Sequence, residues 1–297
     1  MNMNRREFVK NTSMAATGVA LAGTSPLLAN PMGQPLGFQT FEIIQHLVDD
    51  WDGTWKKMAR YGYKVADLVQ FSSNPKLASK SAHDILQSLH AAGLTCTNGH
   101  FSYNSLTQKY GESVAYSHVL GLKSVVCALG PRRKMADDYK WMADQLNTLG
   151  KKLQGDGLML GYHNHEIEFV PVDGGQIPWD ILVAGTDPKL VHFQIDVGNL
   201  TFGGGSAIEY LSKYPGRYYS LHCKDFVKGK ASVPVGQGTL DWKTIFAIAK
   251  KQNIRSYVSE VGAYGVSSLD GVPLEQSPLD VLESFRQSAL FLKKIHT

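Results

Sequence analysis

The chain has 297 residues, of which 43% are hydrophobic and 19% are charged, and its formal net charge is +4 at pH 7. This hydrophobic content is ordinary for a globular protein. Arg5, Arg6 and Lys10, offset by Glu7, contribute half of this net charge, so the chain beyond them is close to neutral. The charge pattern therefore argues against a protein that binds nucleic acid or an anionic membrane surface.

Residues 1–29 have the pattern of an export signal. Arg5 and Arg6 form a twin-arginine pair, and a moderately apolar run follows that is too short and too rich in small residues to span a bilayer stably. Ala29 offers a cleavage site. We therefore predict a twin-arginine signal over 1–29 and a single catalytic domain over 30–297. The prediction implies that the chain is periplasmic, uses the twin-arginine export machinery as a partner and has no stable membrane anchor.

The three cysteines give little support to a metal site of their own. Cys96, Cys127 and Cys223 are each flanked by strand-like residues, which predicts that they are buried as small hydrophobic side chains. An oxidising periplasm leaves room for one disulfide. Their number and spacing exclude a cysteine-rich metal site.

From residue 36 onward, short apolar runs alternate with longer amphipathic stretches. The runs predict strands over 36–41, 62–69, 94–100, 123–129, 158–165, 191–197, 218–224 and 256–260. The longer stretches predict helices over 44–61, 78–92, 108–120, 137–153, 177–185, 207–214, 241–252 and 279–295. Eight strand–helix units predict an α/β fold, namely a single-domain (β/α)8 TIM barrel. A doubly wound open sheet is the alternative, but no Gly-x-Gly-x-x-Gly turn follows the first strand.

Polar residues that suit a metal ion stand where several predicted strands end, at the edge where a barrel of this kind has its active site. The fifth strand ends with His163 and His165, and Glu166 and Glu168 follow. The neighbouring strands end at His100, Asp196, Asn199, His222, Lys224 and Glu260.

Each of these residues also has an ordinary structural interpretation. Asp196 suits a helix cap, His222 a hydrogen-bonded core imidazole, and Glu260 an ion pair with Arg217 or Lys224. Buried charges at four neighbouring strand ends are costly without a partner, however, and one divalent cation can serve all four. The group as a whole therefore favours a metal site.

Five segments in the second half of the chain resemble the xylose-isomerase-like TIM-barrel superfamily of sugar isomerases, epimerases and dehydratases. They are Tyr162-His163-Asn164-His165-x-x-Glu168-Phe169, Gln194-Ile195-Asp196-x-Gly198-Asn199, Leu221-His222-x-Lys224-Asp225, Val235-Gly236-x-Gly238-x-x-Asp241-Trp242, and Glu260. The first half matches more loosely, through Gly37-Phe38-Gln39 and Gly62-Tyr63. Together these motifs are specific for the superfamily and weak for a substrate.

The resemblance implies one divalent cation, usually Mn²⁺, with Zn²⁺, Co²⁺ and Mg²⁺ as alternatives. The ligands that it implies are Glu168, Asp196, His222 and Glu260. The fifth-strand ligand is the open position, because many members have a glutamate where this strand has His163. Glu168 is favoured, and His163 and Glu166 are the alternatives.

The resemblance further implies a sugar isomerase or epimerase that removes a proton next to a carbonyl and works through an enediolate. Glu168, Glu260 and His165 are the acid–base candidates, and the residues expected to bind a small carbohydrate substrate are Gln39, His100, His163, Asn199 and Lys224. The alternative is a dehydratase or lyase that eliminates a substituent from a keto-sugar or 3-keto-glycoside. Homo-oligomers are common in the superfamily, which leaves room for one here.

Two further classes fit less well. A phosphodiester endonuclease of the same superfamily needs several metals and a basic DNA groove, and the near-neutral chain argues against it. A non-catalytic sugar binder has no need of four metal ligands.

Overall fold

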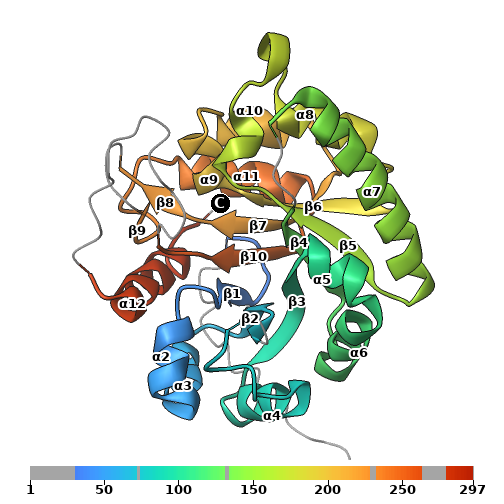
Figure 1. Cartoon of the computed structure of the whole chain (residues 1–297). Coiled ribbons are helices and arrows are strands. Elements are labelled where there is room, and N and C mark those ends of the chain that lie inside the picture. Colours follow the sequence, from blue (N-terminus) through green and yellow to red (C-terminus); the bar gives the residue numbers. More distant parts are fainter. Residues whose placement is uncertain (1–30, 72–73, 131–133, 228–231, 263–278, 297) are drawn as a thin grey trace, which may run out of the picture.

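The computed structural model describes residues 31–71, 74–130, 134–227, 232–262 and 279–296. The export signal predicted over 1–29 lies outside the described residues. In the described part of the chain, eight parallel strands close into a barrel, which confirms the predicted TIM barrel (Figure 1). The strands are β1 (Leu36–Gln39), β2 (Val65–Val69), β3 (Thr95–Ser102), β4 (Ser124–Leu129), β5 (Met159–His163), β6 (Val191–Asp196), β7 (Tyr218–Cys223) and β10 (Ser256–Ser259).

Around the ring the order is β1-β10-β7-β6-β5-β4-β3-β2, so the first and last strands are neighbours. Phe38 of β1 is paired with Ser259 of β10 on one side and with Ala66 of β2 on the other. This pairing closes the sheet, and it brings all eight carboxyl ends to one mouth of the barrel.

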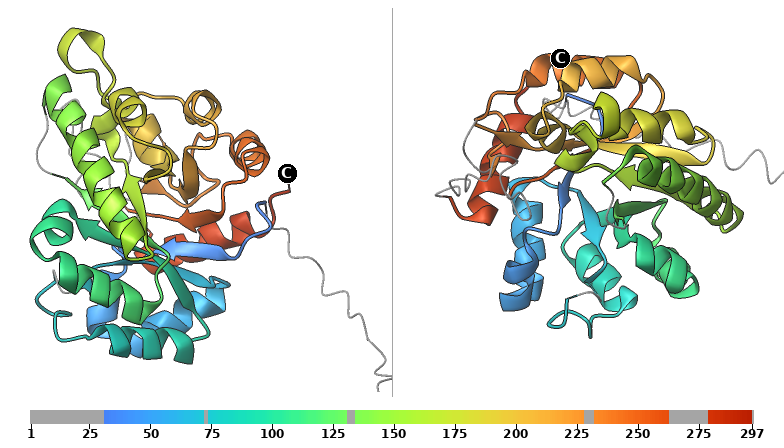
Figure 2. Two further views of the ribbon diagram at one scale, coloured as in Figure 1. Left: turned by 90° about the vertical axis from the view of Figure 1, so that its right-hand side faces the viewer. Right: turned by 45° about the horizontal axis from the view of Figure 1, so that its top comes forward.

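Helices surround the barrel on the outside (Figures 1 and 2). They are α2 (Ile44–Asp49), α3 (Trp51–Tyr61), α4 (Ala82–Ala91), α5 (Tyr103–Gln108), α6 (Tyr110–Leu120), α7 (Ala136–Gly155), α8 (Pro178–Gly185), α9 (Val197–Phe202), α10 (Ala207–Lys213), α11 (Trp242–Lys251) and α12 (Val281–Leu292). Two short 3-10 helices, η2 (Glu166–Phe169) and η3 (Asp173–Gly175), follow β5, and β8 (Asp225–Phe226) pairs with β9 (Ser232–Val233) as a small antiparallel ribbon.

Two differences from the predicted elements have local causes. The helix predicted over 44–61 is two helices, because Asp50 leaves helical geometry and its Oδ1 caps α3 by accepting from the Gly53 N–H at 2.9 Å. The short helix α9 was not predicted. It begins directly after β6, where the side chain of Asp196 accepts from the N–H of Asn199.

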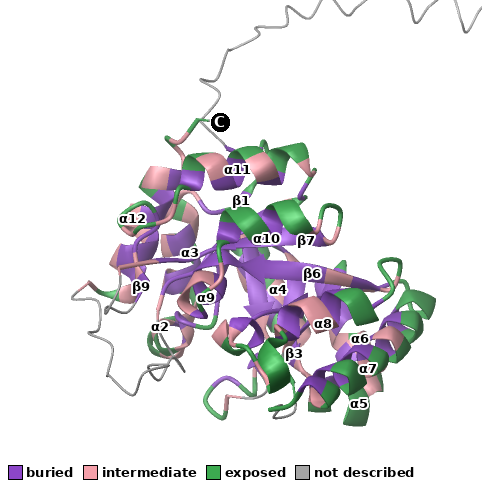
Figure 3. Ribbon diagram, turned by 90° about the horizontal axis from the view of Figure 1, so that it is seen from above, coloured by how far each residue is buried: buried purple, intermediate pink, exposed green. Residues whose placement is uncertain are grey.

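The core lies between the strands and the helices, and the strands are buried along most of their length (Figure 3). Near the chain ends, the ring of Tyr63 packs 5.2 Å from Phe38 of β1 and 5.8 Å from Phe285 of α12, measured between centroids. The Tyr63 hydroxyl donates to the Phe285 carbonyl at 2.9 Å. Aromatic packing therefore fixes the last helix against the first strand.

The three cysteines are buried and unpaired, as their apolar surroundings predicted, so none forms the disulfide that an oxidising compartment would permit. None of the helices in the described part of the chain combines the length and the apolar character that crossing a membrane requires.

Candidate functional site

Four side chains converge at the carboxyl ends of neighbouring strands. His163 ends β5, Asp196 ends β6, His222 lies near the end of β7, and Glu260 follows β10 directly. All four are buried, and one ligand-capable atom of each lies within 4.8 Å of those of the other three. Two imidazoles and two carboxylates at this spacing form a donor set that suits a divalent transition metal.

The ends of β5 and β6 are tied together by Asn164. Its Nδ2 donates to the Asp196 carbonyl at 3.0 Å, and its Oδ1 accepts from the Asp196 N–H at 2.8 Å. The Asp196 side chain uses Oδ1 to accept from the Asn199 N–H at 2.7 Å. Among the residues that the structure describes, its Oδ2 has no hydrogen-bond partner. A buried carboxylate oxygen left in this state fits a cation ligand.

Glu168 lies outside this cluster, so its predicted role as the fifth-strand ligand stays a prediction. Its Oε1 accepts from the Tyr162 hydroxyl at 2.8 Å, and its Oε2 accepts from the His165 N–H at 2.8 Å. The carboxylate therefore caps its own loop at the start of η2. His163, which was the alternative ligand, takes the place in the cluster.

His222, Lys224 and Glu260 form a charged chain along one side of the site. Nδ1 of His222 lies 2.6 Å from Glu260 Oε2, and Nζ of Lys224 donates to Glu260 Oε1 at 3.0 Å. Burial alone would lower the pKa of His222, but hydrogen bonds to Asp67 and Glu260 outweigh it and raise the pKa to about 10. Burial likewise opposes ionisation of Glu260, but Lys224 and His222 hold its pKa well below the usual range.

Two other groups of the site are shifted chiefly by burial. Burial, with the charge of Glu260 added, raises the pKa of Asp196 to about 7. Burial also lowers the pKa of His163 well below its ordinary value, and the nearby His222 and His100 lower it further. His163 is therefore neutral at pH 7, which is the form in which an imidazole binds a metal.

The structure adds two carboxylates that the sequence analysis did not single out. Asp67 lies within β2 and is fully buried, with its Oδ2 2.9 Å from His222 Nε2. Glu42 follows β1, is buried, and has an Oε2 without a partner in the described part of the chain. Burial, and next the charge of Glu260, raise the pKa of Glu42 well above its ordinary value. A charged residue inside the apolar run Val65–Val69 was the available signal for Asp67.

The residues predicted to bind substrate fall into two groups. Gln39, His100 and Lys224 are buried at the carboxyl ends of β1, β3 and β7. The side chain of Asn199 is directed at the backbone instead, with its Nδ2 donating to the Asn164 carbonyl at 3.2 Å. His165 is half-buried, and its ring centroid lies 5.3 Å from that of His163.

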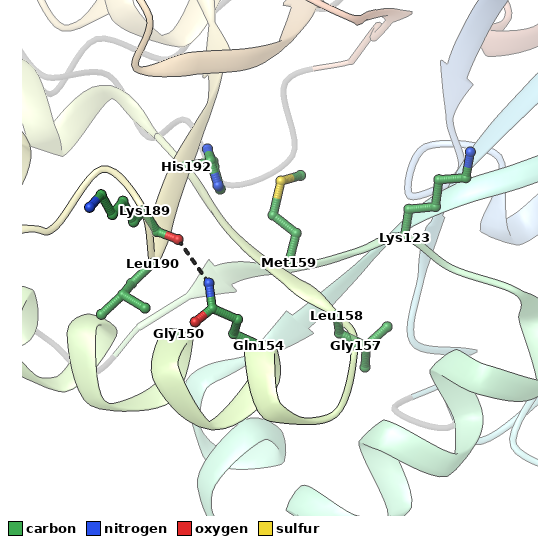
Figure 4. Close-up of a pocket in the computed structure, with 9 residues that line it drawn as sticks. All are labelled: Lys123, Gly150, Gln154, Gly157, Leu158, Met159, Lys189, Leu190 and His192. Atoms are coloured by element: carbon green, nitrogen blue, oxygen red, sulfur yellow. Dashed lines mark hydrogen bonds between the residues drawn. The ribbon is translucent and has the colours of Figure 1, made fainter.

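A separate cavity of about 340 Å³ lies at the opposite end of the barrel, where β4, β5 and β6 begin (Figure 4). Its titratable lining residues are Lys123, Lys189 and His192, with no carboxylate among them. Gln154 of α7 donates to the Lys189 carbonyl at 3.3 Å across its wall. This cavity lacks the mixed donor set of the opposite end, so it is not the candidate active site.

A family model for the xylose isomerase-like TIM barrel matches residues 36–287. The chain belongs to this family. A curated relative, inosose dehydratase from Clostridium beijerinckii, is 30% identical over 141 residues, which are 41% of this chain and 46% of the relative. Inosose dehydratase from Salmonella typhimurium is 24% identical over 182 residues, which are 53% and 58% of the two chains. The chain thus matches about half the length of these relatives.

Solved structures share the fold. A sugar phosphate isomerase/epimerase from Parabacteroides distasonis has a TM-score of 0.73 and 22% identity, with 88% of this chain and 98% of that chain covered. The IOLI protein, solved with a bound zinc atom, has a TM-score of 0.63 and 15% identity, with 87% and 96% covered. The curated relatives are named inosose dehydratase, so the family match supports an enzyme.

Proposed function

We propose that the protein is a metal-dependent enzyme that removes a proton next to the carbonyl of a keto-sugar or keto-cyclitol and eliminates a β-hydroxyl or β-alkoxy group. The observation that carries this proposal is the cluster of His163, Asp196, His222 and Glu260 at the carboxyl ends of four neighbouring strands. When bound there, a divalent cation would polarise the substrate carbonyl and so acidify the adjacent C–H. Two nitrogen and two oxygen donors suit Zn²⁺ or Co²⁺ as well as Mn²⁺.

We assign His165 as the base that takes the proton. Both oxygens of Glu260 are already hydrogen-bonded, to Lys224 and His222, which makes it a poor acceptor. The ring of His165 is half-buried and lies beside His163, with the two ring centroids 5.3 Å apart. An imidazole can accept a proton as a general base.

We assign Glu42 as the acid that protonates the leaving group. Its carboxyl group is buried near the charges of Glu260 and Lys224, and one oxygen is unpartnered in the described residues. In the elimination, the proton passes from carbon to His165, the electron pair forms the new C=C bond, and the C–O bond breaks. The departing oxygen takes the proton of Glu42 and leaves as water or an alcohol. Lys224, close to both carboxylates, provides positive charge beside the substrate oxygens.

Elimination is favoured over isomerisation for two reasons. Both oxygens of Glu168, one of the three acid–base candidates, already accept hydrogen bonds, from the Tyr162 hydroxyl and the His165 N–H. The curated relatives described above are named inosose dehydratase. Isomerisation or epimerisation is the second candidate, and the fold of the Parabacteroides distasonis isomerase/epimerase supports it.

The test uses the full-length protein, stripped with a chelator and reloaded separately with Zn²⁺, Co²⁺, Mn²⁺ or Mg²⁺. Keto-inositols, 3-keto-glycosides and free ketoses are incubated with it in deuterated water. We expect loss of the β-substituent and an unsaturated ketone, with a decrease of about 100-fold or more in His165→Asn. Deuterium uptake into a ketose that keeps all its substituents would support isomerisation instead. A wild type that holds no divalent cation at neutral pH would contradict the metalloenzyme proposal.

We also propose that the chain acts in the periplasm, on the basis of the twin-arginine pattern at Arg5 and Arg6. Cell fractionation of the wild type and of a variant with both arginines changed to lysine tests this. Retention of the variant in the cytoplasm supports the proposal, and identical distribution of the two contradicts it.

A further inference from the structure

We infer that Asp67 and Gln194 are positioning residues that together place the ring proton of His163 on Nδ1, so that His163 offers its Nε2 to a cation. Both residues are fully buried below the cluster. Neither is among the ligands that the cluster itself defines. The ring protons can be placed because some of the neighbouring groups can donate a hydrogen bond and others can only accept one.

The assignment starts from the carboxylate of Asp67. Its Oδ2 lies 2.9 Å from His222 Nε2 and 2.8 Å from Gln194 Nε2. Because an ionised carboxylate only accepts, both partners must donate. His222 therefore carries a proton on Nε2, and its Nδ1, which donates to Glu260 Oε2 at 2.6 Å, must lose its own proton before it can bind a cation. A carboxylate that orients a histidine from behind in this way is a recurrent feature of metal sites.

The orientation of the Gln194 side-chain amide places the ring proton of His163. Its Nε2 faces Asp67, so its Oε1 must accept the two hydrogen bonds on the other side. These come from His163 Nδ1 at 2.9 Å and from His100 Nε2 at 2.7 Å. His163 therefore carries its proton on Nδ1 and has a lone pair on Nε2 for a ligand bond.

Gln39 gives an independent check at the other end of this chain of hydrogen bonds. Its Oε1 accepts from the backbone N–H groups of Thr40 and Phe41, so its Nε2 is the atom that donates to His100. This donor lies 3.3 Å from both Nδ1 and Nε2 of His100, and because Nε2 donates to Gln194, Nδ1 is the nitrogen that can accept from Gln39. Both nitrogens of His100 are thus engaged.

This result separates two overlapping groups of ligand-capable residues. One comprises His100, His163 and His222, and the other comprises His163, Asp196, His222 and Glu260. Because His100 has no free lone pair, the second group is the one prepared for a cation. His100 acts instead as a support for Gln194, which holds His163.

The tautomer of His163 can be measured without any metal. Long-range proton–nitrogen NMR spectra of metal-free protein labelled at histidine distinguish a proton on Nδ1 from one on Nε2. We expect Nδ1–H at His163 in the wild type and loss of that preference in Gln194→Met, which keeps the volume but removes the acceptor. Circular dichroism and thermal melting confirm that the variant is folded. Nε2–H at His163 in the folded wild type would overturn the inference.

A double-mutant cycle on Zn²⁺ affinity tests the positioning role, and this part rests on the metal site proposed above. We expect Gln194→Met and Asp67→Asn each to weaken Zn²⁺ binding by about 10–100-fold. In a His163→Ala background, Gln194→Met should cost nothing further, because its effect acts through His163. Gln154→Met, at the opposite end of the barrel, is the matched control and should leave affinity unchanged.

The NMR and Zn²⁺-affinity measurements separate failure of the proposed metal site from failure of the positioning role. A wild type with Nδ1–H at His163 that binds no divalent cation would contradict the proposed metalloenzyme but not the tautomer assignment. A wild type that binds Zn²⁺ and loses affinity additively in the double variant would overturn the positioning role alone.

Discussion

The two halves of the barrel contribute different kinds of group to the site. Strands β5, β6 and β7 and the residue after β10 provide the cluster of His163, Asp196, His222 and Glu260. Strands β1, β2 and β3 provide Gln39, Asp67 and His100. Asp67 is hydrogen-bonded to His222 of the cluster, His100 is hydrogen-bonded to Gln194, and Gln39 contacts His100. The second half thus presents donor atoms to the mouth. The first half supports the histidines among them through Asp67, which contacts His222 directly and His163 only by way of Gln194 of β6. A barrel permits this division because its closed ring places β2 opposite β6 and β7.

The largest effect on cation affinity should come from removing one of the proposed ligands in the second half of the barrel. We expect His222→Ala to weaken binding of Zn²⁺ or Mn²⁺ by more than about 100-fold, because it removes a donor and leaves Glu260 and Asp67 without their shared partner. Isothermal titration of the chelator-treated protein measures this. His192→Ala, at the opposite end of β6, is the matched control and should bind as the wild type does. Equal affinities of the two variants would contradict a cation site that includes His222.

How much of this could be predicted depends on where a residue lies in its strand. His222 and Glu260 end apolar runs, so their positions could be predicted from the sequence alone. Asp67 lies inside a strand, where only the structure shows that it faces the barrel interior and meets His222. Its role depends on pairing between strands that are far apart in the chain, which sequence periodicity does not encode.

Glu168 shows how a local interaction can place a side chain differently from what a family resemblance implies. The resemblance to sugar isomerases favoured a glutamate at this position, but the chain folds into a 3-10 turn after His165 and directs the carboxylate to its own backbone. A capping interaction over three residues is local and forms at little entropic cost, so it prevails over a longer reach to the neighbouring strands.

The next largest effect should be on the stability of the fold, at the close contact between α9 and the end of β7. A Cβ added at Gly198 would lie 2.6 Å from the backbone oxygen of Lys224. We expect Gly198→Ala to destabilise the protein by about 1–3 kcal/mol, because backbone atoms must move apart. Urea denaturation measures the change. Gly111→Ala is the control: its added Cβ meets nothing within 4 Å, and alanine in helix α6 should be neutral or stabilising. Equal stability of the two variants would contradict the packing argument.

The affinity for a cation should rise by about tenfold or more between pH 5.5 and pH 8. Burial raises the pKa of Asp196 to about 7, so the folded, metal-free protein binds a proton there between the ordinary pKa of an aspartate and 7. This group therefore stabilises the metal-free fold at low pH, and the contribution is lost as pH rises through 7. A cation must displace that proton.

We accordingly expect Zn²⁺ to bind more tightly, and to raise the melting temperature more, at pH 8 than at pH 5.5. Titrations in buffers of different ionisation enthalpy should show proton release at pH 7. Asp196→Asn should lose much of this pH dependence together with affinity. A thermal shift that is the same at both pH values would contradict the involvement of a protonated ligand.

The smallest effect on the metal should come from Glu168, although it lies only a few residues from His163. We expect Glu168→Gln to lower the melting temperature, because one of the two groups that donate to the carboxylate loses its acceptor. Zn²⁺ affinity should stay within about twofold of the wild type, since Glu168 is not a member of the cluster. His163→Ala is the comparison variant, and it should lose affinity strongly. If the two variants exchanged these results, the fifth-strand ligand would be Glu168, and the hydrogen bonds that hold it in its loop would have to open when the cation binds.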